Sequence, residues 1–170
     1  MKLRMYVMCS KKIKKYIPLV LLLSIVFYCK DSEKTTASEN SNKAFAVVLQ
    51  ENDKVIEAII KDSEKNPDLS FLISSIESAK SIVVEDGLKR ALEEEGRILQ
   101  DAKSMDKEGK YEAISRFSEH LSTAVNTGGV KLEGYNRFYC PMVSKYWMAK
   151  GTDINNPFAP DMRDCGEIKN

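Results

Sequence analysis

The sequence predicts an all-α domain, an up-down four-helix bundle with an irregular, cysteine-containing C-terminal segment packed on it. Four stretches between residues 43 and 126 carry apolar residues at helical spacing, and short turn signals separate them. The chain after Val130 has no such spacing. It still holds six aromatic side chains and two cysteines, so it has apolar area to bury against the helices.

Length and composition limit the class of protein. The 170 residues suffice for one domain and a leader, and 30% charged with 43% hydrophobic residues is typical of a globular chain. The formal net charge is +1, and no basic face stands out. We therefore expect no nucleic-acid partner.

The first 29 residues are typical of a signal peptide. Four lysines between residues 11 and 15 precede an apolar run, Ile17 to Tyr28, which is shorter than the roughly 20 residues that a membrane-spanning helix needs. An uncleaved anchor is the alternative. Cys9 precedes the lysines and would be lost with the leader.

Cys29 ends the apolar run and is followed by polar residues, which resembles the signal of bacterial lipoproteins. The resemblance implies that Cys29 is lipidated and that a lipid anchor holds the protein in the membrane, in the periplasm or at the outer membrane. Otherwise, Cys29 simply closes the leader. Residues 30–43 are rich in Ser, Thr, Glu, Asn and Lys, and we expect a flexible tether there. A single helical domain is then predicted over residues 44–170.

The first helix is expected over about residues 43–62. In the stretch after it, Asn66 suits a helix cap, Pro67 the first helical position and Asp68 the positive end of the helix dipole. The second helix should therefore begin there.

The third helix should follow a break at Glu85-Asp86-Gly87 and carry Leu88, Leu92 and Leu99 on one face; the alternative is one helix that runs through these three residues. The fourth is expected over about 106–126, and the glycines after Thr127 suit its end.

Cys140 and Cys165 are the cysteines that remain once the leader is removed and Cys29 is lipidated. Pairing is the usual outcome for two cysteines in an exported chain. We expect a short strand near Arg137 to Cys140, and turns at Asn156-Pro157 and at Gly166.

The C-terminal segment has an ordered pattern of motifs: Cys140-Pro-Met142, then Trp147, then Ile154-Asn-Asn-Pro-Phe158, then Met162-Arg-Asp-Cys165-Gly. A weaker helical element is Tyr111 to Ser115. In these motifs the chain resembles a bacterial domain-of-unknown-function family, number 3347. Members of this family occur alone in exported proteins and fused to periplasmic adaptors of heavy-metal efflux systems. The resemblance therefore implies a metal-efflux adaptor or another envelope protein as partner.

Two hypotheses concern the sulfur atoms. Cys140, Met142, Met162 and Cys165 are soft ligands that suit Cu(I), and Trp147 could cover the ion with its ring face. Alternatively, Cys140 and Cys165 form a disulfide, and the two methionines fill gaps in the core beneath the aromatic rings. The cysteines cannot do both at the same moment.

Catalytic patterns are absent from the sequence, so we expect no enzyme. His120, the only histidine, is expected to be partly exposed or hydrogen-bonded rather than a metal ligand. Glu93 to Glu95 should form a solvated helix face. The expected function is a membrane-tethered, non-enzymatic accessory protein of the cell envelope that handles copper or a similar soft metal. The alternative is a disulfide-stapled helical module for protein interaction or structural support, without a metal.

Overall fold

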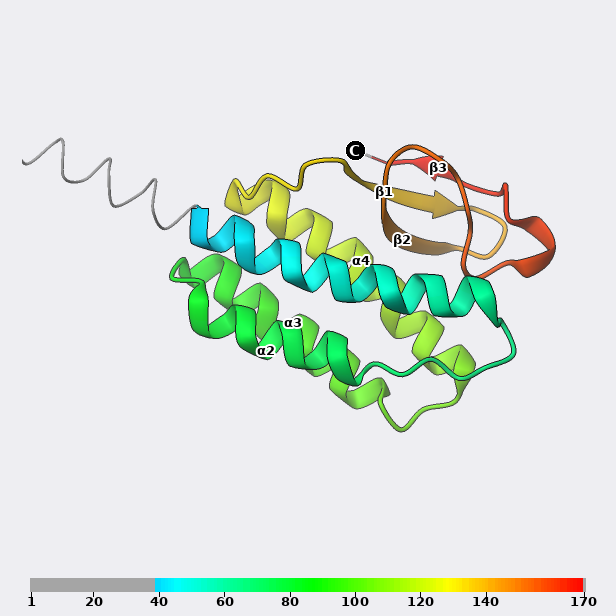
Figure 1. Cartoon of the computed structure of the whole chain (residues 1–170), viewed down its shortest axis with the longest axis horizontal. Coiled ribbons are helices and arrows are strands. Elements are labelled where there is room, and N and C mark those ends of the chain that lie inside the picture. Colours follow the sequence, from blue (N-terminus) through cyan, green and yellow to red (C-terminus); the bar gives the residue numbers. More distant parts are fainter. Residues whose placement is uncertain (1–38, 170) are drawn as a thin grey trace, which may run out of the picture. The chain divides into compact units, whose positions relative to one another are not determined.

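The computed structural model describes residues 39–169, which form four helices and a small antiparallel sheet (Figure 1). The first helix covers residues 39–61, followed by α2 (Ser70–Ile82), α3 (Asp86–Ala102) and α4 (Lys107–Gly128). The four-helix bundle is therefore confirmed, but a domain without strands is not, because the C-terminal segment contains a sheet.

The boundary of the predicted tether is wrong by a few residues, since 39–43 already belong to the first helix. The rest of the tether, the signal peptide and Cys29 lie outside the described residues. Within those residues, the structure contains no helix that is both long enough and apolar enough to cross a membrane.

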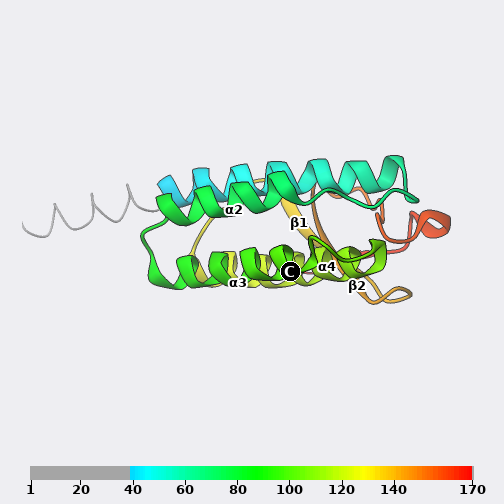
Figure 2. The same ribbon diagram turned by 90° about the horizontal axis from the view of Figure 1, so that it is seen from below.

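The helices form two layers. The first helix and α2 lie side by side in one layer and α3 and α4 in the other, with consecutive helices antiparallel (Figures 1 and 2). Their apolar stripes meet in one core, whose largest fully buried helical side chains are Phe45, Leu49, Ile59, Leu72, Ile76, Leu92, Leu99, Ile114 and Phe117. Burial of such a side chain contributes roughly 1.5–3 kcal/mol. This shared core holds the bundle together.

The ends of α4 follow the prediction, but the start of α2 does not. Asp106 accepts a hydrogen bond from the backbone of Gly109 at 2.9 Å, and Gly129 ends α4 with φ 70°, a left-handed conformation that suits glycine. At α2, the predicted cap Asn66 instead donates to the carbonyl of Met105. The N-cap position is held by Leu69, which has no capping side chain, and Asp68 just before it accepts from the backbone of Ser70 at 2.9 Å.

The C-terminal segment folds as three antiparallel strands in the order β2-β1-β3. They are β1 (Tyr135–Cys140), β2 (Lys145–Lys150) and β3 (Glu167–Ile168). The predicted strand near Arg137 to Cys140 is confirmed. The prediction missed β2 because residues 141–144, which connect it to β1, lack the glycine or Asn-Gly pair that marks most tight hairpins. Here Ser144 adopts the positive φ, 53°.

The sheet lies against the first helix and α4. The Asn52 amide of the first helix donates to the carbonyl of Met148 at 3.1 Å, and the Ser115 hydroxyl of α4 accepts from the backbone of Tyr146 at 2.8 Å. Lys145 in β2 is close to Glu108 and Glu112 of α4, at 3.1 and 3.0 Å. The two helices therefore position the hairpin on which the candidate site is built.

Candidate functional site

The centre of the site is a disulfide between Cys140 and Cys165. Cys140 ends β1 and is fully buried, whereas Cys165 follows the short 3-10 helix η1 (Pro160–Met162) and is half-buried. Their Cα atoms are 5.6 Å apart across a separation of 25 residues. The disulfide prediction is thus confirmed. In this state the two sulfurs are bonded to each other and are not thiolate ligands.

The two methionines of the predicted copper set lie at the surface. Met142, in the connection between β1 and β2, is 70% exposed, and Met162, the last residue of η1, is 36% exposed. The alternative that they fill gaps in the core is therefore wrong. Met162 stays close to the disulfide along the chain, because the backbone of Cys165 donates to its carbonyl at 3.0 Å.

Trp147 belongs to the core of the segment. It is fully buried and faces Phe138 of β1, with ring centroids 5.3 Å apart and planes 11° apart. Gly166 is so close that an added Cβ would lie 2.6 Å from the Cη2 atom of Trp147. A packed ring of this kind explains why glycine follows Cys165: any larger residue would push the tryptophan from its place.

Asn156 organises the loop between β2 and η1. It is fully buried; its side chain donates to the carbonyl of Cys165 at 3.0 Å and accepts from the backbone of Phe158 at 2.9 Å. The guanidinium of Arg163 donates to the carbonyl of Asn156 and, at 3.3 Å, to that of Ile60 in the first helix. The sequence predicted a turn at Asn156 but gave no signal for Arg163, whose partners come from distant positions.

The element Tyr111 to Ser115 of α4 contacts the C-terminal segment at two points. The ring of Tyr111 packs against that of Phe158 with centroids 5.3 Å apart, and Ser115 bonds to the backbone of Tyr146. The hydroxyl of Tyr111 also donates to the carbonyl of Ser63, at 3.1 Å. This element of α4 therefore anchors the loop and the hairpin at the same time.

A separate polar group lies in the bundle, where the sequence predicted a solvated face. Glu93 and Glu94 are exposed, but Glu95 is 1% exposed, and its Oε2 atom has no hydrogen-bond partner. The pKa of Glu95 is raised to about 8, mainly by burial and also by the Glu94 carboxylate, while Arg116 acts against both. His120, 44% exposed, has Nδ1 3.7 Å from Oε1, too far for a hydrogen bond.

Comparison of the chain with family models, curated proteins and solved structures found no match. The resemblance of the tail to family 3347 therefore stays a prediction. Within residues 39–169, no three His, Cys, Asp or Glu side chains gather as a metal-binding group.

Proposed function

We propose that this chain is an exported, membrane-tethered, non-enzymatic accessory protein of the bacterial cell envelope, whose C-terminal segment is an interaction or structural module. The observation that carries the proposal is the Cys140–Cys165 disulfide. Disulfides persist in oxidising compartments such as the periplasm and are rare in the cytosol. The predicted signal peptide and the predicted lipidation of Cys29 also indicate the periplasm.

The disulfide closes the segment over two helices. The hairpin is held on α4 by the bond from the backbone of Tyr146 to the Ser115 hydroxyl. The loop before Cys165 is held on the first helix by the bond from Arg163 to the carbonyl of Ile60. This arrangement presents the 141–144 turn, with Met142 largely exposed, at a fixed position on the protein. Preorganised loops of this kind lose little conformational entropy when they bind a partner.

Two experiments test the compartment and the anchor. Protein from intact cells, alkylated before reduction and analysed by mass spectrometry, should show Cys140 and Cys165 linked; alkylated free thiols in that material would contradict the proposal. Labelled palmitate should be incorporated by the wild type and by Cys9→Ser, but not by Cys29→Ser. Equal labelling of all three proteins would exclude Cys29 as the lipidated residue.

Copper binding is the second candidate. One observation favours it: the two cysteines are adjacent, and Met162 lies one turn before Cys165. A dithiol reductant that supplies two electrons and two protons converts the disulfide to two thiols, whose thiolates would join the thioether as soft Cu(I) ligands. Oxidised protein should bind no Cu(I) at this site.

Competition with a chromogenic Cu(I) chelator tests this candidate on the reduced protein. Met162→Leu should weaken binding, whereas Met105→Leu, a control at an exposed methionine beyond α3, should not. The double variant Cys140→Ser/Cys165→Ser should lose the site. Equal uptake by that double variant and the reduced wild type would rule out copper at the cysteines.

A metal-efflux adaptor is the partner suggested by the family resemblance. Crosslinking in intact cells, followed by purification of the chain, should then recover such an adaptor. Recovery of no adaptor, under conditions in which both proteins are present in the envelope, would count against this partner but not against the anchored module itself.

A further inference from the structure

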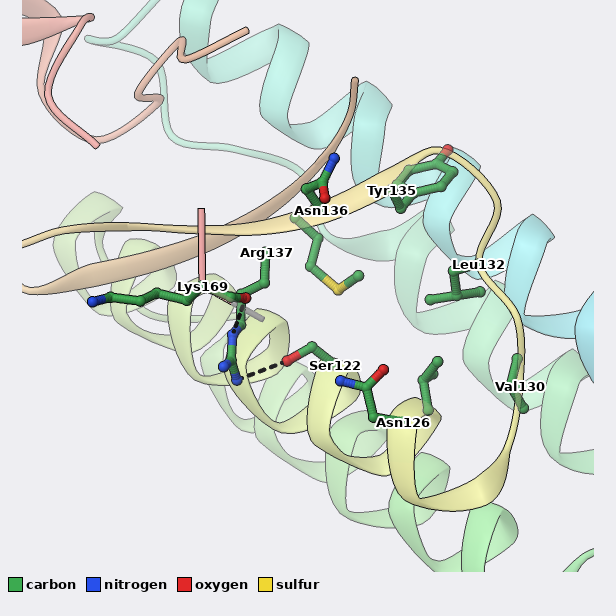
Figure 3. A pocket seen from close by; sticks show the side chains of 10 residues that line it. Ser122, Asn126, Val130, Leu132, Tyr135, Asn136, Arg137 and Lys169 are labelled. Atoms are coloured by element: carbon green, nitrogen blue, oxygen red, sulfur yellow. Dashed lines mark hydrogen bonds between the residues drawn. The ribbon is translucent and has the colours of Figure 1, made fainter. Parts of the chain in front are cut away.

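A cavity of about 190 Å³ lies between α4, the 129–134 connection and β1, away from the disulfide (Figure 3). Figure 3 shows Ser122 and Asn126 entering it from α4, Leu132 from the connection and Arg137 from β1. It exceeds the roughly 150 Å³ that suffices for a benzene molecule in a protein core. The space thus suits a ring or a branched chain of similar size.

The cavity has an apolar wall. Val125, Val130 and Met148 line it and are at least nine-tenths buried, and Leu132 packs against the same core. Small-molecule sites are typically apolar with a few polar groups that fix the orientation of the ligand. An apolar part of a ligand would therefore lie along this wall.

The cavity also carries a positive charge, next to Met148, because Arg137 of β1 pairs with Met148 of β2 in the sheet. The guanidinium of the half-buried Arg137 donates from Nη1 to the Ser122 hydroxyl at 3.0 Å and from Nε to the carbonyl of Lys169 at 3.3 Å; it also lies 5.5 Å above the Tyr146 ring. Among residues 39–169, no carboxylate lies within ion-pair distance of it.

Arg137 has donors to spare. Its guanidinium carries five N–H groups, and two of its three nitrogen atoms make the bonds described. A guanidinium fork matches the two oxygens of a carboxylate. Asn126, exposed on the last turns of α4 beside Ser122, adds an amide at the rim (Figure 3).

The other polar residues around the cavity are directed elsewhere. The ammonium of Lys169 extends away from the cavity in Figure 3 and pairs with Glu167 at 2.6 Å. The side chain of Asn136 donates to the carbonyl of Gly151, and the hydroxyl of Tyr135 donates to Asp53. Arg137 is therefore the cation that a ligand in this cavity meets.

We propose that this cavity binds a small monocarboxylate with a compact apolar part, an aromatic or branched-chain acid. Its carboxylate pairs with Arg137 and the Asn126 amide, and its apolar part contacts Val125, Val130 and Met148. The site is independent of the disulfide and of any metal at the cysteines.

Benzoate is the probe, and benzamide, of nearly the same shape but uncharged, is its matched control. Binding to the purified full chain is followed by NMR or thermal shift. We expect saturable binding of benzoate in the millimolar range and at least about tenfold weaker binding of benzamide, the loss expected for a charge-assisted hydrogen bond. Equal binding of the two probes, or no saturable binding of benzoate in that range, would overturn the proposal.

Two variants separate binding from folding. Asn126→Asp adds a carboxylate at an exposed position on the rim of the cavity that Arg137 lines, and should weaken benzoate binding about tenfold or more without unfolding the protein. Thr127→Asp, one residue further along α4 and outside the cavity lining, adds the same charge and should leave binding nearly unchanged. An undiminished affinity of the Asn126→Asp protein would show that benzoate binds elsewhere.

Discussion

Replacing Glu95 by glutamine tests whether the buried carboxyl of α3 destabilises the bundle as the pH rises. Glu95 is 1% exposed, and its pKa is raised from 4.5 to about 8, mainly by burial. Glutamine keeps the shape of the side chain and carries no charge at any pH in this range. The comparison therefore isolates the cost of ionising a carboxyl inside the bundle.

The sign follows from the proton balance. Below about pH 4.5 the carboxyl is protonated in both the folded and the unfolded chain, so wild type and Glu95→Gln should have similar free energies of unfolding. Between about pH 4.5 and about pH 8 the unfolded chain has lost this proton and the folded chain retains it. Stability therefore falls as the pH rises, by about 1.4 kcal/mol per pH unit at most.

Over the whole interval, Glu95→Gln should become more stable than the wild type by about 3 to 5 kcal/mol. Urea unfolding at a series of pH values, followed by the fluorescence of Trp147, measures this difference. Glu93→Gln, at an exposed position two residues away, should run parallel to the wild type. A pH-independent difference between Glu95→Gln and the wild type would refute the reasoning, and a difference of opposite sign would refute it equally.

Three further substitutions test the C-terminal segment. Replacing Cys140 and Cys165 by serine should lower the free energy of unfolding by about 3 to 4 kcal/mol relative to the oxidised wild type, the loop entropy for a separation of 25 residues, as measured by urea unfolding; the reduced wild type should resemble the double variant. Asn156→Ala removes two side-chain hydrogen bonds and leaves their partners without a replacement; we expect a loss of about 2 to 4 kcal/mol by the same assay. Gly166→Ala places a Cβ 2.6 Å from the ring of Trp147. It should lower the free energy of unfolding by about 1 to 3 kcal/mol and shift the tryptophan emission. Unchanged emission and stability would show that the ring is not held against Gly166.

The helices could be predicted because their apolar spacing is a local property of the sequence, and the disulfide because few cysteines are available to pair. Apolar spacing marks each helix, and once Cys9 and Cys29 are assigned to the predicted leader, the two remaining cysteines leave a single pairing. The burial of Glu95 was also within reach of the sequence. It lies three residues after Leu92 and four before Leu99, on the apolar stripe of α3, although its acidic neighbours suggested an exposed face.

Other features depend on contacts that one sequence does not reveal. The hairpin closes with a positive φ at Ser144 rather than at a glycine, so its turn carries no sequence mark. Arg163 bonds to Ile60, 103 residues earlier, and Arg137 to Ser122 and Lys169. Such pairings arise from the packing of the sheet on the bundle, which periodicity does not specify.

The bonds from the first helix to the C-terminal segment have a consequence for how the protein is made. Asn52, Asp53 and Ile60 find their partners 96, 82 and 103 residues later. Long-range contacts of this kind slow folding, and synthesis proceeds from the N-terminus. The helix over residues 39–61 is therefore synthesised well before the last strands that complete its surroundings, so this part of the chain stays incompletely folded until the C-terminal segment has been made.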